Sequence, residues 1–142
     1  MSNNNKIKLL FVCTGNSCRS QIAEGWAGHL KGNVIDAYSA GISPIGVSSR
    51  AIKVMAEAGV DISNQKSQSL EEFSEIDFDY IITLCDNAAQ RCPVFTGTVK
   101  VLHKPFEDPY FATGSEEDIM ETFRKVSNDI RIFIESMPDN LK

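Results

Sequence analysis

The sequence predicts a single α/β domain built on a four-stranded parallel sheet with helices on both faces. Short apolar runs of strand length alternate along the chain with longer stretches whose apolar residues recur at helical spacing. The first run, Ile7–Val12 (IKLLFV), is apolar almost throughout, which is typical of a strand buried on both faces of a parallel sheet. The 142 residues suffice for one compact core, and we expect one domain over residues 1–142.

Each expected helix has a local signal. The first begins between residues 17 and 20, and its apolar residues Ile22, Trp26 and Leu30 recur every four positions. The second covers residues 49–58 and ends at Gly59, a common stop signal. The segment 69–72 (SLEE) has the pattern of a capping box that opens a short helix.

The last helix begins after Ser115, and its apolar stripe is expected to pack in the core. That stripe consists of Ile119, Phe123, Val126, Ile130, Phe133 and Met137. After the first strand, further strands are expected at residues 34–40, 80–84 and 99–102, and one or two helical turns at residues 86–91.

The composition argues against several classes of protein. A net charge of -5 and a pI near 5.0 do not suit broad nucleic-acid binding. No apolar run approaches the about 18 residues of a membrane span, and the N-terminus (MSNNNKIK) lacks the apolar core of a signal peptide. We therefore expect a cytoplasmic monomer without nucleic-acid or membrane partners.

The four cysteines indicate more about the function than the overall composition does. A cytoplasmic domain of this size does not depend on structural disulfides. The spacings C-x4-C and C-x6-C differ from the C-x2-C pairs of common zinc sites, so no metal site is expected. Cys13 and Cys85 each directly follow an expected strand, and ligands of parallel sheets bind at the carboxyl ends of strands.

The segment 13–20 (CTGNSCRS) has the pattern of an anion-binding loop between a strand and a helix. Gly15 and Asn16 tolerate the left-handed backbone that lets consecutive N–H groups converge, and the positive end of the following helix points at the same centre. Arg19 adds a forked donor for an oxyanion. These fields favour the thiolate of Cys13, which we interpret as a nucleophile, the alternative being a buried structural cysteine. The expected oxyanion-binding residues are Thr14, Gly15, Asn16, Ser17, Cys18 and Arg19.

These residues resemble the phosphate-binding loop of the low-molecular-weight protein tyrosine phosphatases and of the arsenate reductases that share their fold. The resemblance implies the flavodoxin-like strand order of that family. It also implies that Cys13 is the nucleophile, that Arg19 binds the oxyanion and that Ser20 donates a hydrogen bond to the thiolate. By the same resemblance, Asp108 is the general acid. By its local sequence alone, Asp108-Pro109 would indicate a turn.

The segment 84–93 (LCDNAAQRCP) resembles the redox segment of thioredoxin-coupled arsenate reductases, and residues 20–26, 38–41 and 61–64 are similar to the same family. The resemblance implies a relay in which Cys13 attacks arsenate and Cys85 then attacks Cys13, releasing arsenite and leaving a Cys13–Cys85 disulfide. Cys92 next attacks Cys85, and thioredoxin reduces the resulting Cys85–Cys92 disulfide. A helix over residues 85–92 would separate its ends by roughly 10.5 Å. A disulfide requires Cα atoms about 4.4–6.8 Å apart, so we expect this segment to unwind on oxidation.

Other hypotheses stay open. Tyr110 and Phe111 resemble the aromatic rim with which phosphatases bind phosphotyrosine. The alternative function is therefore a low-molecular-weight phosphatase that hydrolyses phosphomonoesters through a Cys13 phosphocysteine, and residual phosphatase activity is expected in a reductase too. A third hypothesis is a non-catalytic oxyanion-binding or redox-sensing module.

Some relatives hold potassium through residues that match Asn16, Glu24 and Ser39 together with a later carboxylate. This chain has Gln68 where that carboxylate is expected, so we assign no potassium site and expect no tightly bound cofactor. The two histidines, His29 and His103, are expected at the surface or behind the site rather than as catalytic bases.

Overall fold

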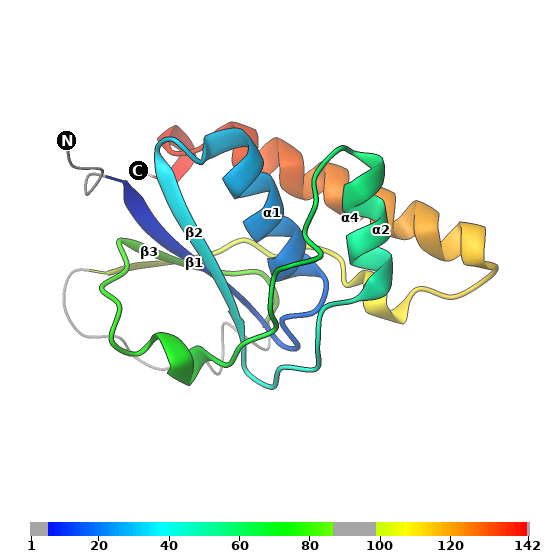
Figure 1. The fold of residues 1–142 in the computed structure, drawn as a ribbon, viewed down its shortest axis with the longest axis horizontal. Coiled ribbons are helices and arrows are strands. Elements are labelled where there is room, and N and C mark those ends of the chain that lie inside the picture. The colour runs from blue at the N-terminus through cyan, green and yellow to red at the C-terminus, as the bar shows by residue number, and fades with distance from the viewer. Residues whose placement is uncertain (1–5, 87–98, 142) are drawn as a thin grey trace.

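The structure is a computed structural model that describes residues 6–86 and 99–141. Four strands form one sheet: β1 (Ile7–Cys13), β2 (Ile35–Gly41), β3 (Tyr80–Thr83) and β4 (Lys100–His103). Their order is β2-β1-β3-β4 and every pairing is parallel (Figure 1). This is the predicted four-stranded parallel sheet in flavodoxin-like order, and each strand lies within one residue of its expected ends.

Three α-helices and three short 3₁₀ helices complete the described elements. They are α1 (Arg19–Lys31), α2 (Ser49–Glu57), α4 (Glu116–Glu135), η1 (Leu70–Phe73), η2 (Pro109–Phe111) and η3 (Asp139–Leu141). The expected turns over residues 86–91 lie outside the described residues except for Asp86, and so does Cys92. The predicted unwinding of residues 85–92 therefore stays a prediction.

The helices α1, α2 and α4 pack against one another on one side of the sheet (Figure 1). The residues of β2 show which face they cover, because successive side chains of a strand point to opposite faces. Ser39 bonds to Glu24 of α1, whereas its neighbour Tyr38 packs edge-to-face against Phe73 of η1. The short helix η1 therefore covers the face opposite α1.

Four of the six residues of the predicted apolar stripe of α4 are in the core, and Ile119 and Phe133 are half-buried against it. Phe123, Val126 and Ile130 are at most 2% exposed, and Met137, just past the end of the helix, is equally buried. Trp26 of α1 packs beside them, and its indole N–H donates to Ser127 of α4 at 3.0 Å. Burial of these side chains between α1 and α4 stabilises the packing of the two helices, because apolar area removed from water contributes about 25 cal/mol per Å².

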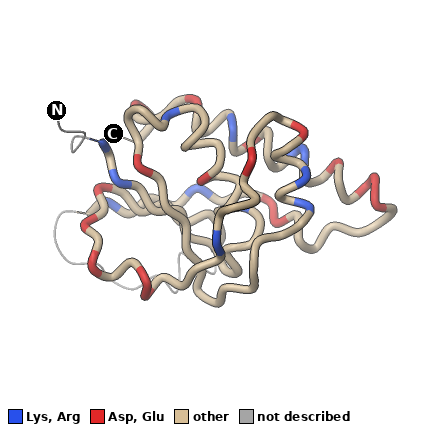
Figure 2. Tube along the Cα trace, in the orientation of Figure 1, with Lys and Arg blue, Asp and Glu red and all other residues tan. Residues whose placement is uncertain are grey.

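Charged residues of both signs are interspersed along the chain (Figure 2). No helix among the described residues combines the length and apolar character needed to cross a membrane.

Candidate active site

The segment from Cys13 to Ser20 connects β1 to α1 and turns around one centre. Each carbonyl oxygen from Cys13 to Cys18 accepts a hydrogen bond from outside this loop. The carbonyl and N–H groups of a trans peptide point in opposite directions, so outward carbonyls leave N–H groups directed at the centre. This is the geometry that an anion-binding nest requires. The donors are the backbone N–H groups of Ile22, Ile42, Ser43, Ile45 and Ser48 and the side-chain amide of Gln21.

Asn16 is the residue of this loop that adopts a left-handed backbone, with φ of 46°. Its side chain is fully buried; the amide oxygen accepts from the backbone N–H of Gln68 at 2.7 Å, and the amide nitrogen donates to Ser20 at 2.7 Å. The backbone of Gly41 in β2 lies against it, and a Cβ at that glycine would sit 2.8 Å from the Asn16 nitrogen. The loop conformation therefore depends on the small residue at position 41.

The Cys13 sulfur lies 2.9 Å from the Ser20 hydroxyl oxygen, and both residues are buried. Because Ser20 accepts a hydrogen bond from Asn16, its own hydrogen is available to the sulfur. A hydroxyl that donates to sulfur favours the thiolate, which is the nucleophilic form of cysteine. The contacts that run from Asn16 through Ser20 to Cys13 are therefore those that the expected nucleophilic role of Cys13 requires.

Arg19 connects the oxyanion loop to the segment that carries Asp108. One of its terminal nitrogens lies 3.0 Å from the Asp108 carboxylate, and the other donates to the Phe106 carbonyl at 3.1 Å. The second carboxylate oxygen of Asp108 accepts from the Tyr110 N–H at 3.0 Å and so caps η2. Asp108 is thus both a turn residue, as its local sequence indicates, and a carboxyl group held at the site.

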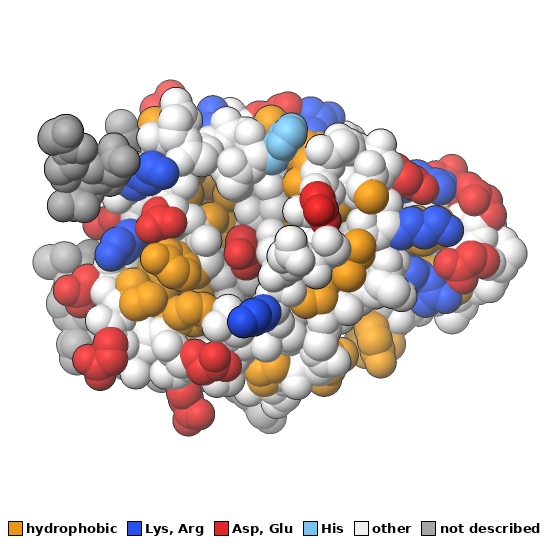
Figure 3. Space-filling model, viewed as in Figure 1, with side chains coloured by type: hydrophobic (Ala, Val, Ile, Leu, Met, Phe, Trp, Pro, Cys, Tyr) orange, Lys and Arg blue, Asp and Glu red, His pale blue; other side chains and the backbone are white. Residues whose placement is uncertain are grey.

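A cavity of about 360 Å³ opens above the loop. Tyr110 and Phe111 stand at its edge with their rings 5.1 Å apart and nearly perpendicular. They are 57% and 72% exposed, and hydrophobic side chains protrude from the surface where η2 lies (Figure 3). The cavity is lined by Cys13, Thr14, Gly15, Ser17, Cys18, Arg19, Ser43, Ile45, Asp108, Tyr110 and Phe111.

Cys85 follows β3, the strand beside β1, and its sulfur lies 3.3 Å from the hydroxyl oxygen of Thr14. The sequence places Cys85 at the same edge of the sheet as Cys13 but does not predict this contact with the oxyanion loop. Cys13, Cys18 and Cys85 are not joined by disulfides. Burial raises the pKa of the Cys18 thiol to about 11, which keeps it protonated and unreactive at neutral pH.

Two of the three residues that match a potassium site in some relatives, Glu24 and Ser39, contact each other, whereas the Asn16 side chain bonds to Ser20 and Gln68. Glu24 accepts a 2.5 Å hydrogen bond from Ser39, and burial raises the pKa of its carboxyl. The Gln68 side chain donates to Glu72, not to this group. Within residues 6–86 and 99–141, no three His, Cys, Asp or Glu side chains are arranged to hold a metal ion.

The sequence does not predict two sets of contacts at the site, although it places His103 at the surface or behind the site. Gln21, fully buried, ties the loop carbonyl of Asn16 to the Lys66 carbonyl. His103 contacts both Thr83 and Asp86 beside Cys85. The only available signal was positional: His103 ends the strand that pairs with the strand before Cys85.

A sequence model of the low-molecular-weight phosphotyrosine protein phosphatases matches residues 8–142. The chain is 45% identical to an arsenate reductase of Bacillus subtilis over 126 residues, which are 89% of this chain and 90% of that protein. It is 40% identical to arsenate reductase 2 of Staphylococcus epidermidis over 131 residues, which are 92% of this chain and 95% of the relative.

Solved structures show the same fold. An arsenate reductase in a phosphate-binding state superposes with a TM-score of 0.77 at 33% identity, over 96% of this chain and 99% of that one. A low-molecular-weight protein tyrosine phosphatase from T. tengcongensis superposes with a TM-score of 0.74 at 26% identity, over 95% and 99% of the two chains. The loop geometry, the strand order and these similarities agree: the chain belongs to the low-molecular-weight phosphotyrosine protein phosphatase family.

Proposed function

We propose that this protein is an arsenate reductase in which Cys13, Cys85 and Cys92 transfer electrons in turn from thioredoxin to arsenate. The observation that carries the proposal is the contact between Thr14 and Cys85, which brings a second thiol to the loop that holds the first. Hydrolysis of a phosphomonoester needs only one thiol. The identity to curated arsenate reductases over most of the chain supports the same function.

Arsenate is a tetrahedral oxyanion like phosphate, so the same loop accepts both. The inward N–H groups of the loop and the guanidinium of Arg19 would bind its oxygens. The Cys13 thiolate then attacks arsenic, and one oxygen leaves as water after protonation by Asp108. The product is a Cys13–arsenic(V) ester.

Reduction takes place at sulfur. The Cys85 thiolate attacks the Cys13 sulfur, an S–S bond forms, and the electron pair of the S–As bond passes to arsenic, which leaves as arsenite. Cys92 then attacks the Cys85 sulfur, and the Cys13 thiolate leaves. A dithiol of thioredoxin reduces the Cys85–Cys92 disulfide, so two thiol electrons account for the reduction of one As(V) to As(III). We propose a monomer acting in the cytoplasm, where thiols remain reduced.

The test is NADPH oxidation that depends on arsenate, with thioredoxin and thioredoxin reductase present. Wild type should turn over, Cys92→Ser should lose nearly all arsenate turnover, and both should hydrolyse aryl phosphate at similar rates. Cys13→Ser should lose both activities. Equal arsenate turnover by Cys92→Ser and wild type would contradict the relay.

The exposed aromatic pair at the cavity edge supports a second candidate, hydrolysis of aryl phosphates through a Cys13 phosphocysteine. Stacking on Tyr110 and Phe111 would favour an aromatic leaving group by about 1 kcal/mol. Comparing kcat/KM for phenyl phosphate and a short alkyl phosphate tests this candidate in wild type and Phe111→Ala. A preference for phenyl phosphate that is lost in the variant supports it, and equal values in wild type exclude aromatic recognition.

A further inference from the structure

His103, at the end of β4, contacts residues on both sides of Cys85 in the chain. Its Nδ1 atom is 2.9 Å from the Thr83 hydroxyl oxygen, and its Nε2 atom is 3.0 Å from the Asp86 carboxylate. Thr83 ends β3 and is the parallel partner of His103 in β4. The imidazole thus spans from the end of β3 to the residue that directly follows Cys85.

The two neighbours of Cys85 in the chain are held in different ways. Leu84 is fully buried; its N–H donates to Val12 of β1 at 2.8 Å, and its carbonyl accepts from Phe106 at 3.1 Å. Asp86 has a side chain 84% exposed and is held through its carboxylate by His103. Within the described residues, Leu84 on the N-terminal side of Cys85 is therefore held by backbone bonds, and Asp86 on the C-terminal side is held by the imidazole through its carboxylate.

The hydrogen bonds of His103 with Thr83 and Asp86 can form in either protonation state of the imidazole ring. When the imidazole is neutral, the Thr83 hydroxyl donates to Nδ1 and the Nε2–H donates to Asp86. When the ring is charged, Nδ1–H donates to Thr83, whose hydroxyl hydrogen turns to the Leu102 carbonyl at 3.3 Å. Because Nε2 carries a hydrogen in both states, the contact with Asp86 persists when His103 gains or loses a proton.

We infer that His103 is a positioning residue for Cys85: it holds Asp86 and thereby keeps the Cys85 thiol against Thr14, at the oxyanion loop. The inference rests on the proposed function, because it is the relay that requires Cys85 at this position. It assigns the imidazole no proton transfer and no contact with arsenate. His103 is also absent from the lining of the cavity above Cys13.

The same contact is weak enough to be released. The imidazole and carboxylate side chains are 38% and 84% exposed, so water and salt compete for the pair. The proposed relay needs both properties: Cys85 must wait near Cys13 and must then leave to react with Cys92. A buried, stronger link at Asp86 would oppose the second step.

The test compares substitutions of His103 that remove both hydrogen bonds of the ring with substitutions that retain one of them. His103→Ala removes both bonds, His103→Asn retains a group near Nδ1, and His103→Gln places an amide near Nε2. His29→Ala, at the other histidine of the chain, is the matched control, since His29 is exposed on α1. Rates are measured by single-turnover arsenite release from the reduced protein without thioredoxin, and by mass spectrometry of iodoacetamide alkylation at each cysteine.

Arsenite release should slow about fivefold in His103→Ala and His103→Asn, as the loss of one exposed pair implies, and the arsenate concentration that gives the half-maximal single-turnover rate should not change. His103→Gln should stay within about twofold of wild type, since it can still donate to Asp86. Alkylation of Cys85 should accelerate about fivefold in the Ala and Asn variants. Alkylation of Cys18, which is 4% exposed, should not change. His29→Ala should match wild type throughout.

Asp86→Ala should behave like His103→Ala, and the double variant should be no slower than either, because both substitutions break one contact. Unchanged Cys85 alkylation in His103→Ala, or equal acceleration at Cys18 and Cys85, would overturn the inference. If wild type itself releases no arsenite, the proposed function fails, and the alkylation ratio still decides whether His103 positions Cys85.

Discussion

The guanidinium of Arg19 lies 3.0 Å from the carboxylate of Asp108, so the expected oxyanion ligand is paired with the expected general acid. Both groups are largely withdrawn from solvent, with side chains 9% and 28% exposed. An oxyanion that binds Arg19 competes with this carboxylate for the guanidinium and is repelled by its negative charge. Binding and acid catalysis therefore place opposite demands on Asp108.

Asp108→Asn should bind oxyanion more tightly and react more slowly. Removal of the competing charge should lower the Kd of inorganic phosphate about fivefold, the equivalent of about 1 kcal/mol. Loss of the general acid should slow aryl phosphate hydrolysis about 100-fold. Calorimetry and steady-state kinetics measure the two effects. Glu107→Gln, which alters the neighbouring acid that pairs with Lys125, is the control and should change neither.

Ser20→Ala should lower the reactivity of Cys13. The variant removes the hydroxyl that lies 2.9 Å from the sulfur, and hydrogen bonds to charged groups are strong enough for an effect of about tenfold or more. The rate of Cys13 carboxymethylation by iodoacetate at pH 7 reports it. Ser136→Ala, at the C-terminal end of α4, should keep the wild-type rate, and an unchanged rate in Ser20→Ala would refute the activating role of this hydroxyl.

Glu24→Gln should stabilise the protein at neutral pH. Burial raises the pKa of the Glu24 carboxyl in the folded state, so the folded protein holds this proton more tightly than the unfolded chain does. The contribution of this group to stability is therefore complete below the unfolded pKa and is lost as pH rises through the folded pKa. A glutamine can still accept the bond from Ser39 without a charge.

Urea unfolding of wild type and Glu24→Gln from pH 4 to pH 8 measures this difference. The stability advantage of Glu24→Gln should grow with pH over that range. The same comparison for Glu71→Gln, an exposed residue of η1, should show no such growth. An advantage for Glu24→Gln that is independent of pH would contradict the assigned cause.

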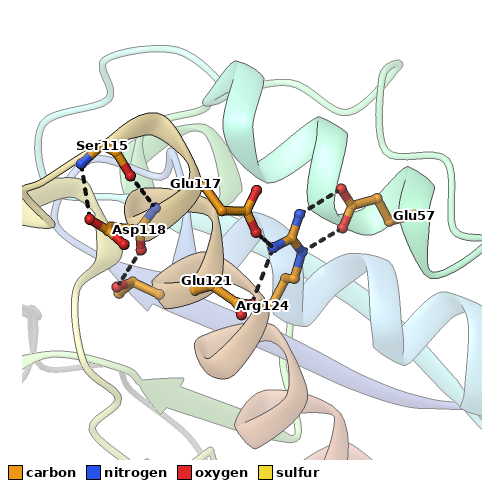
Figure 4. A network of polar contacts seen from close by, with 7 residues as sticks. Glu57, Ser115, Glu117, Asp118, Glu121 and Arg124 are labelled. Atoms are coloured by element: carbon orange, nitrogen blue, oxygen red, sulfur yellow. Dashed lines mark hydrogen bonds and ion pairs between the residues drawn. The ribbon is translucent and has the colours of Figure 1, made fainter.

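Arg124→Ala should weaken the packing of α2 on α4 without affecting the active site. Arg124 of α4 pairs with Glu57 of α2 at 2.9 Å and with Glu117 and Glu121 of its own helix (Figure 4). The melting temperature should fall, and less so at 1 M salt, because exposed ion pairs are screened. Aryl phosphate hydrolysis should stay unchanged.

This loss should also disappear in acid. Arg124 lowers the pKa of the Glu57 carboxyl in the folded state, so the pair stabilises the fold above the unfolded pKa of Glu57 and ceases to do so as pH falls through the folded value. Melting curves of wild type and Arg124→Ala should therefore converge at low pH. Arg131→Ala removes an ion pair that is confined to α4. Comparing its melting curves with those of Arg124→Ala tests whether the effect comes from the link between α2 and α4.

The sequence by itself determined the elements and the loop. Strand and helix signals are local, so each described strand was predicted within one residue. The strand-to-helix segment with Cys13, Gly15 and Arg19 predicted an anion site, and the structure shows that this segment turns around one centre. The resemblance to a known family added Ser20 and Asp108, and the structure places the Ser20 hydroxyl 2.9 Å from the Cys13 sulfur and the Asp108 carboxylate 3.0 Å from the Arg19 guanidinium.

Only the tertiary structure decided which distant residues meet. Thr14 and Cys85 are 71 positions apart, and they touch because the sheet places β3 beside β1. His103 reaches Asp86 because β4 pairs with β3 in a register that puts it opposite Thr83. Local propensity carries no information on strand order or register, since these follow from the burial of the whole sheet. The residue types around Cys13 could therefore be recognised from the sequence. Their contacts could be known only from the fold.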